Sequence, residues 1–378
     1  MQPIIEIANL IKRYGDNTVL QDLSLTILPG ELLVVLGESG SGKSTLLKLI
    51  AGLELPCSGR LCISGADQAN VPPHRRDIAV VFQSGNGYSH LTVRENLSLA
   101  AKSSRSSARA QEEELDRWIQ ELDLDPLLTK KLPQLSGGQS QRVAIARAFI
   151  SGKSILLMDE PLAHLDQALR QQVRDIIARH HLGSDRSIIY VTHDSEEAMF
   201  LASRIAVLAQ GQIQQIGSPR QVYESPTTKG VATILGRPAM DIIEMPERWL
   251  AEDDQRNSNQ THLSQQVNCG IRPHEWQIDK IDVVHNEKAN SMEIGLRSDG
   301  ARIRLCGRIK IVRWLGDRWI MVVNTGEFEF KVTCSTECQE QIRNQLEDVA
   351  KINMSDQSVF GLVTASVAKA RLKRFPKS

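Results

Sequence analysis

The segment from Gly37 to Thr45 has the residue types and spacing of a phosphate-binding loop. Gly37, Gly42, Lys43 and Ser44 stand at the fixed positions of the pattern G-x-x-x-x-G-K-[ST]. Glycines let successive backbone N–H groups converge on phosphate oxygens. Lys43 would reach the β and γ phosphates, and Ser44 would ligate the Mg²⁺ that bridges them. We expect a nucleoside triphosphate to bind through Gly37, Glu38, Ser39, Gly40, Ser41, Gly42, Lys43, Ser44 and Thr45.

Two adjacent acids, Asp159 and Glu160, follow the apolar run Ile155 to Met158. At the end of a buried strand beside the loop, one carboxylate would lie near the metal and the next near the γ phosphate. Asp159 would hold Mg²⁺ through water, whereas Glu160 would accept a proton from the attacking water. Standing alone, such a pair would be two solvated acids at a strand end. The phosphate-binding loop favours the catalytic interpretation.

Three short apolar runs supply the strands that must position these residues. Leu32 to Leu36, Ile155 to Met158 and Ile188 to Val191 lack polar alternation, as strands covered on both faces do. The first ends at the loop, and the helical run Thr45 to Ala51 follows it. This context disfavours a Gly/Ser-rich turn that arose by chance. We expect an α/β core with a parallel sheet.

Other segments predict additions to this core. Leu23, Leu25 and Ile27 alternate with polar residues, and Leu61 to Ile63 lies between two glycines, which indicates a half-exposed antiparallel layer. Between positions 98 and 131, a polar stretch predicts an inserted helical region, because four apolar residues recur at helical spacing: Leu115, Trp118, Ile119 and Leu122.

Length and composition limit the class of protein. With 378 residues the chain is long enough for two domains. Lys plus Arg and Asp plus Glu are each 45, so the charge favours no nucleic-acid partner. Six scattered cysteines fit a reducing cytoplasm. Because no long apolar segment is present, we expect a chain that is neither secreted nor membrane-spanning, so other chains must supply any membrane part.

The residue pattern changes after position 235. Apolar residues alternate with polar ones up to Asp299-Gly300 and again beyond it, which predicts a hairpin. They are Met292, Ile294 and Leu296 before the turn, and Ile303 and Leu305 after it. More short strands follow and suit a small barrel. We therefore expect one domain at 1–235, with a helical subdomain at about 84–150, and a second, mostly β domain at 236–378. The polar stretch Ala251 to Gln266 is predicted to be a loop or a disordered insert.

A third motif, Leu135-Ser136-Gly137-Gly138-Gln139, precedes the acidic pair, and the run Gln141 to Ala148 follows it. At this point the chain resembles the ABC ATPase family. The resemblance implies a P-loop NTPase core with an antiparallel β layer and a helical subdomain. It also implies a head-to-tail dimer, in which Ser136, Gly137, Gly138 and Gln139 contact the γ phosphate bound by a second chain. A hydroxyl and free N–H groups at a helix start suit an anion.

The same resemblance suggests roles for four further residues. Gln83 resembles the glutamine that senses metal and water, and His193 resembles the switch histidine. Asp166 resembles the aspartate at the dimer contact. Tyr14 resembles the aromatic residue that stacks on adenine, so the nucleotide is expected to be ATP. Alone, Tyr14 or Gln83 would be an ordinary surface or core residue. The ordered series of motifs supports these roles.

Several segments resemble the importer branch of the family, namely Val71 to Gln83, Thr92 to Asn96 and Gly217 to Tyr223. Gly236 to Asp241 and Gly270 to Glu275 resemble the oligonucleotide-fold-type domain of carbohydrate and glycerol-phosphate importers of the maltose type. The resemblance implies an ATPase subunit at the cytoplasmic face of the inner membrane. It would pair with itself or with a close relative, and work with two permease subunits and an extracytoplasmic solute-binding protein. Sulfate, polyamine or iron are alternative solutes.

The segment after Gln83 departs from the family. These importers usually carry an aromatic and apolar stretch leading to Tyr-Pro-His, whereas here Gly85 and Gly87 fall within Ser84 to His90. Because glycines remove side chains and add flexibility, we expect an altered docking surface for membrane subunits. An ABC ATPase acting on DNA, chromosomes or ribosomes is the competing class, although coiled-coil insertions and a second ATPase domain are missing. A regulatory role for the β domain could coexist with transport.

Overall fold

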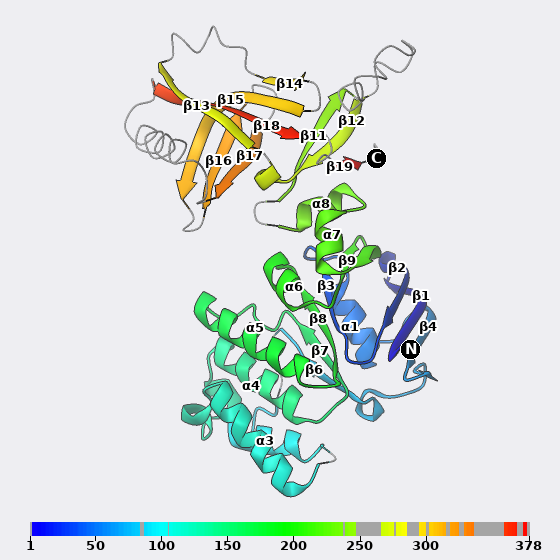
Figure 1. Cartoon of the computed structure of the whole chain (residues 1–378). Helices are drawn as coiled ribbons and strands as arrows, with labels where there is room; N and C mark the ends of the chain where they lie inside the picture. The colour runs from blue at the N-terminus through cyan, green and yellow to red at the C-terminus, as the bar shows by residue number, and fades with distance from the viewer. Residues whose placement is uncertain are drawn as a thin grey trace. The chain divides into compact units, whose positions relative to one another are not determined.

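The computed structural model (Figure 1) divides into two units, Met1–Glu224 and Ser225–Ser378. It describes residues 2–83, 87–104, 106–236, 239–246, 266–275, 277–285, 295–299, 302–314, 318–324, 329–335, 359–368 and 373–375. The division at 224/225 lies before the expected boundary at 235/236. It assigns the short helix α8 (Lys229–Ile234) to the second unit.

A six-stranded sheet forms the centre of the first unit, in the order β10-β9-β3-β8-β7-β6. Its strands are β3 (Leu32–Leu36), β6 (Ile78–Val81), β7 (Ile155–Asp159), β8 (Ser187–Thr192), β9 (Arg204–Ala209) and β10 (Gln212–Gly217). All neighbours pair in parallel except β9 and β10. Every residue of β3, β7 and β8 is buried. The predicted parallel core is therefore confirmed, and the loops after β3, β6, β7 and β8 leave the sheet at one edge.

One face of this sheet packs against helix α1 (Lys43–Ala51) and an antiparallel sheet. The antiparallel sheet has the order β2-β1-β4-β5, with β1 (Ile5–Tyr14), β2 (Asn17–Ile27), β4 (Ser58–Ile63) and β5 (Ala66–Asp67). Alternate residues of β2, including Leu23, Leu25 and Ile27, are buried in the shared core. The half-exposed antiparallel layer predicted from the alternation is confirmed.

Helices α4 (Gly137–Ile150), α5 (Gln167–Leu182) and α6 (Ser195–Leu201) lie on the other side of the parallel strands from α1 (Figure 1). The predicted helical region contains α2 (Val93–Ala101), α3 (Ala108–Glu121) and the 3₁₀ turns Asp125–Leu127 and Leu132–Gln134. Its four apolar residues at helical spacing are buried. A 3₁₀ turn at Pro73–Arg75 precedes β6, and α7 (Pro219–Glu224) ends the unit. Among the described helices, none has the length and apolar character needed to cross a membrane.

The described part of the second unit consists mainly of antiparallel strands. One sheet has the order β11-β12-β19, with β11 (Asp241–Pro246), β12 (Gln266–Ile271) and β19 (Lys373–Phe375). The other has the order β13-β18-β15-β16-β17, with β14 paired to β15. Its strands are β13 (Gln277–His285), β14 (Gly295–Asp299), β15 (Arg302–Trp314), β16 (Arg318–Asn324), β17 (Glu329–Ser335) and β18 (Val359–Ala368). Asp299 pairs with Arg302, which confirms the predicted hairpin.

Two buried polar side chains join separate segments of this unit by hydrogen bonds. Arg272 Nη1 donates to the carbonyl oxygens of Ala232 at 3.2 Å and Leu235 at 2.6 Å, at the end of α8. The carboxylate of Asp241 accepts the N–H of Lys331 at 2.8 Å, and burial raises the pKa of Asp241 to about 6. Positions 251–265 of the predicted polar insert lie outside the described residues, and Gln266 begins β12.

Candidate nucleotide-binding and catalytic site

The loop between β3 and α1 needs glycine at three of its positions. A Cβ at Gly37 would lie 2.3 Å from the carbonyl oxygen of Leu208, so no side chain fits there. Gly40 and Gly42 have φ of +82° and +103°, in the left-handed region that glycine adopts without strain. A Cβ at Gly42 would also lie 2.7 Å from Leu20 Cδ2. The backbone can therefore turn tightly into α1, with its N–H groups at the helix start.

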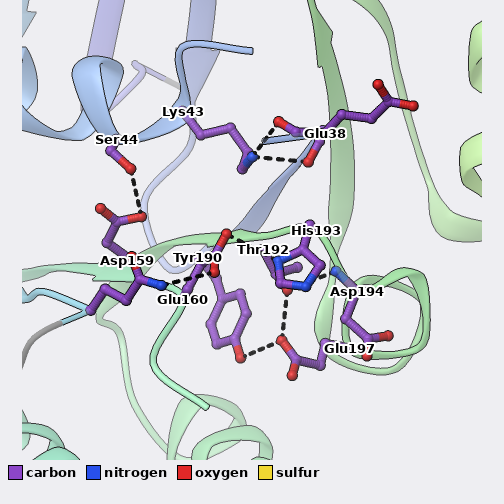
Figure 2. A network of polar contacts seen from close by, with 12 residues as sticks. Glu38, Lys43, Ser44, Asp159, Glu160, Tyr190, Thr192, His193, Asp194 and Glu197 are labelled. Carbon is purple, nitrogen blue, oxygen red and sulfur yellow. Dashed lines mark hydrogen bonds and ion pairs between the residues drawn. The ribbon is translucent and has the colours of Figure 1, made fainter. Parts of the chain in front are cut away.

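Lys43 and Ser41 give this loop the features of an anion site. The residue Lys43 is almost fully buried, and its ammonium group donates to the carbonyl oxygens of Gly37 at 2.9 Å and Glu38 at 2.8 Å (Figure 2). Burial lowers the pKa of Lys43, and the nearby Glu160 and the other acids oppose this shift. Among the residues that the structure describes, the buried Oγ of Ser41 has no hydrogen-bond partner. A buried cation and an unsatisfied hydroxyl fit a phosphate group, because each gains a strong acceptor.

Ser44 and Asp159 place two oxygen atoms that can bind a metal ion next to each other, beside the loop. Ser44 Oγ donates to Asp159 Oδ1 at 3.1 Å (Figure 2). Burial raises the pKa of Asp159, whereas the hydrogen bond from Ser44 lowers it. A hydroxyl and a carboxylate oxygen are ligands that Mg²⁺ accepts in nucleotide sites, where phosphates and water complete the coordination. The two residues therefore fit the metal that the sequence predicts.

Three segments converge on Glu160, which directly follows β7. Glu160 Oε1 lies 3.0 Å from His193 Nδ1, and Oε2 accepts a long hydrogen bond of 3.5 Å from Gln83 Nε2. Its φ of +45° lies in the left-handed region, which costs free energy for a residue other than glycine. Its N–H donates to Val191 O at 2.9 Å and so ties this conformation to β8. We call Lys43, Ser44, Gln83, Asp159, Glu160 and His193 the Glu160 cluster.

Tyr14 lies at the end of β1 and is 46% exposed. Its hydroxyl donates to the carboxylate of Glu54, which also pairs with Lys12 at 3.2 Å and Lys48 at 3.6 Å. The Lys12 ammonium lies 4.9 Å from the centre of the Tyr14 ring. The ring is thus anchored at its hydroxyl while much of it remains accessible to a flat group. Sequence reasoning missed Glu54, because its distance from Tyr14 along the chain carries no signal.

Ser136 to Gln139, which we call the signature segment, begins α4. Ser136 Oγ accepts the N–H of Gln139 at 3.3 Å, and Gln139 Oε1 accepts the N–H of Ser136 at 3.0 Å. This reciprocal capping box stabilises the helix start and leaves Ser136 exposed. A Cβ at Gly138 would lie 3.0 Å from His164 O, so glycine lets the loop after β7 approach. That loop leads to Asp166, whose carboxylate accepts the N–H of Leu169 at 3.0 Å and caps α5.

The structure thus brings many of the expected site residues together in two groups, whereas Tyr14 lies with Glu54 at the end of β1. The Glu160 cluster lies at the edge of the parallel sheet. The signature segment lies against the loop that ends at Asp166, at the starts of α4 and α5.

The segment after Gln83 is only partly described, because Ser84 to Asn86 lie outside the described residues. A Cβ at Gly87 would lie 2.3 Å from Leu132 Cδ1 and 2.8 Å from Asn96 Oδ1. Asn96 also binds the backbone of Tyr88, accepting its N–H at 2.8 Å and donating to its carbonyl at 3.1 Å. The lack of a side chain at Gly87 permits close packing of this anchored segment, and the flexibility expected there stays a prediction.

Comparisons with known proteins agree with this geometry. The profile of the ABC transporter family matches residues 20–163. The sn-glycerol-3-phosphate import ATP-binding protein UgpC 2 of Rhizobium johnstonii is 38% identical, over 83% of this chain and 93% of its own length. The maltose/maltodextrin import ATP-binding protein MalK of Salmonella typhimurium is 37% identical, over 82% and 83%.

Solved structures resemble the first part of the chain. One is a dimeric ATP-binding cassette in a post-hydrolysis state with ADP and Pi, with a TM-score of 0.52 and 30% identity, covering 57% of this chain and 99% of that one. Another is cbiO1 of Clostridium perfringens, part of the ABC transporter complex cbiONQ, with a TM-score of 0.52 and 26% identity, covering 59% and 91%. With its phosphate loop, acidic pair and signature segment in this fold, the chain belongs to the ABC transporter family of ATP-binding proteins.

Proposed function

We propose that this chain is the ATP-hydrolysing subunit of an importer for a carbohydrate or a glycerol phosphate. The observation that carries the proposal is the position of Glu160 between Gln83 and His193, beside the Ser44–Asp159 pair and the buried Lys43. The names of the relatives UgpC 2 and MalK support the solute class.

The chain's own residues have distinct roles in this proposal. Lys43 exchanges its two carbonyl partners for phosphate oxygens, and the exposed ring of Tyr14 stacks on adenine. Bound Mg²⁺ would supply positive charge to the phosphates. Ser44 and Gln83 would hold the ion directly, and Asp159 would hold it through water. Glu160 accepts a proton from the attacking water, and His193 holds the Glu160 carboxylate in position.

The signature segment completes the site of a second chain. Ser136 is exposed at the start of a capped helix, where its hydroxyl and nearby N–H groups can meet the γ phosphate held by another copy. Asp166 lies at the contact between the two copies. The partner is a second copy or a close relative, closed by ATP and loosened by hydrolysis. A dimeric relative of known structure supports this arrangement.

The remaining parts of the proposal concern the membrane and the second domain. A hollow of about 720 Å³ suits docking of permease subunits at the cytoplasmic face. Its lining includes Arg94, Leu99 and Lys102 in or next to α2, and Asp125, Leu128 and Thr129. An extracytoplasmic binding protein would deliver the solute. Residues 1–235 form the nucleotide-binding domain, and residues 236–378 form an oligonucleotide-fold-type barrel with a regulatory role. The antiparallel strands of the second unit support the barrel.

ATP turnover tests the catalytic part of the proposal. Glu160→Gln should lower kcat of the purified protein at least 100-fold while ATP still binds, because the amide cannot accept the proton. The variant should form an ATP-dependent dimer visible by light scattering. Adding Ser136→Arg should abolish that dimer and leave ATP binding intact. Normal turnover in Glu160→Gln would show that another group is the base.

Co-purification tests the transport part. The tagged protein, extracted from membranes in mild detergent, should retain two integral membrane subunits. These subunits, reconstituted with the protein and a solute-binding protein, should take up a carbohydrate or a glycerol phosphate only with ATP. Recovery with ribosomes or DNA, and without an integral membrane protein, would reject the importer.

A further inference from the structure

The turn that carries His193 is closed by a single hydroxyl group. Thr192, the last residue of β8, precedes His193, and Asp194 follows it. Thr192 Oγ1 accepts the N–H of Asp194 at 2.9 Å and donates to Glu197 Oε2 at 2.8 Å (Figure 2). The backbone on both sides of His193 is therefore held by one buried oxygen.

Glu197 holds this hydroxyl from the first turn of α6. Its carboxylate is 5% exposed, and the same Oε2 also accepts the hydroxyl of Tyr190 at 2.9 Å. Burial raises the pKa of Glu197. The spacing from Asp194 to Glu197 is that of a capping box, in which Glu197 would accept the Asp194 N–H. Here that N–H goes to Thr192 instead, and Glu197 reaches inward to Thr192.

His193 depends on this turn for its orientation. Its side chain is 60% exposed, so packing leaves the imidazole largely unrestrained, yet Nδ1 lies 3.0 Å from Glu160 Oε1. The direction in which its Cα–Cβ bond points is set by the backbone that Thr192 closes. A catalytic contact of this kind loses rate steeply when a group moves by about 1 Å.

We propose that Thr192 and Glu197 are positioning residues that direct His193 onto Glu160. The inference rests on the proposed role of Glu160 and His193 in ATP hydrolysis. Glu197 orients the Thr192 hydroxyl by accepting its hydrogen bond, which leaves the oxygen lone pairs for the Asp194 N–H. Both residues are buried beneath the turn, so we infer that they act through His193.

Tyr190 offers a matched control on the same carboxylate. It is fully buried in β8, and its hydroxyl bonds Glu197 at nearly the same distance as Thr192 does. Its removal costs one buried hydrogen bond without opening the turn at His193. A purely structural role of the network predicts similar effects for Tyr190 and Thr192, whereas the positioning role predicts different effects on turnover.

Steady-state ATP hydrolysis and thermal unfolding of the full chain test the proposal. Thr192→Val should lower kcat about tenfold or more, with KM for ATP within about twofold. Thr192→Ser keeps the hydroxyl and should retain kcat within about twofold, as should Glu197→Gln, whose amide oxygen still accepts. Tyr190→Phe should lower Tm like Thr192→Val but keep kcat within about twofold.

A double-mutant cycle with His193→Ala completes the test. Thr192→Val should cause no further loss of kcat in the His193→Ala background, because the group it positions is gone. Equal losses in both backgrounds, or unchanged kcat in Thr192→Val, would overturn the positioning role and leave the proposed function intact. Failure of the proposed function is seen separately, as normal turnover in Glu160→Gln.

Discussion

Glu160 is held by side chains from two other segments, Gln83 at 3.5 Å and His193 at 3.0 Å, whereas Ser136 and Gln139 hydrogen-bond each other within one helix turn. The Glu160 cluster combines the buried charges of Lys43 and Asp159 with the more exposed side chains of Gln83 and His193. The signature segment has no charged residue and presents an exposed hydroxyl and two glycines.

In the proposed function, both regions hold a phosphate, but they differ in how their own groups are satisfied. At the Glu160 cluster, burial shifts the pKa of Lys43 down and that of Asp159 up, so the free site keeps charge at an energetic cost that a bound ligand can offset. At the signature segment, the capping box already provides hydrogen-bond acceptors for the backbone N–H groups of Ser136 and Gln139 without a ligand. In the proposed function, the first region therefore determines affinity for the nucleotide, and the second completes a site only when two chains meet.

Lys43→Met should have the largest effect, because it removes the buried cation from the loop. We expect ATP affinity to fall about 100-fold, because the variant loses two charge-assisted hydrogen bonds to phosphate that contribute about 1.5 kcal/mol each. Titration of the fluorescence of a labelled ATP analogue would measure it. Lys48→Met, on the same helix but 45% exposed in its side chain, is the control and should bind ATP normally. Equal affinities of the two variants would remove Lys43 from the phosphate site.

Ser136→Ala should lower ATP turnover about tenfold, through loss of a hydrogen bond to the γ phosphate held by the other chain, at about 1.4 kcal/mol. It should also cost about 1 kcal/mol of stability by removing a helix cap. Ser107→Ala is the matched control, since Ser107 Oγ caps α3 by accepting the Ala110 N–H at the same 3.3 Å. Both variants should lose similar stability in urea unfolding, but only Ser136→Ala should lose turnover. Parallel losses of turnover would mean that Ser136 acts only as a cap.

Gly138→Ala and Gly137→Ala separate packing from helix propensity in the signature segment. A Cβ at Gly138 would press on His164 O at 3.0 Å, whereas one at Gly137 would meet its nearest neighbour at 3.6 Å. Gly138→Ala should therefore be about 1 kcal/mol less stable than Gly137→Ala, which gains helix propensity. Urea unfolding without nucleotide would measure the difference. Equal stabilities would indicate that the loop before Asp166 moves to accommodate the added Cβ without a cost in stability.

Asp159→Asn should have a small, pH-dependent effect on the nucleotide-free protein. Burial raises the pKa of Asp159 above its ordinary 3.8, so the native state binds the proton more tightly than the unfolded chain. The contribution of Asp159 to the free energy of unfolding is fully present below pH 3.8 and is lost as the pH rises through the pKa of Asp159 in the folded state. The variant, which cannot ionise, should melt above the wild type at pH 8, with a difference that shrinks toward pH 4. Calorimetry across this range would check it, and a lower Tm for the variant at pH 8 would contradict the burial argument. The loss of stability in Ser136→Ala, by contrast, should not vary with pH.

Much of the fold could be predicted from local patterns. The buried strands β3, β7 and β8, the antiparallel layer and the β14–β15 hairpin follow from apolar runs and alternation, because these patterns reflect which faces are covered. Gly87 could not be interpreted in the same way. A glycine in sequence is compatible with flexibility or with close approach, and only the position of Leu132 reveals the close approach.

The sequence by itself determined the phosphate loop, the acidic pair and the signature segment, because each motif is contiguous and its chemistry depends on neighbouring residues. Only the tertiary structure decided that Glu160 meets Gln83 and His193, that Glu54 anchors Tyr14, and that Thr192 and Glu197 close the turn at His193. Most of these contacts join strands and loops far apart along the chain. Which side chains meet at the edge of a parallel sheet depends on strand order and register, and no local pattern in the chain encodes these.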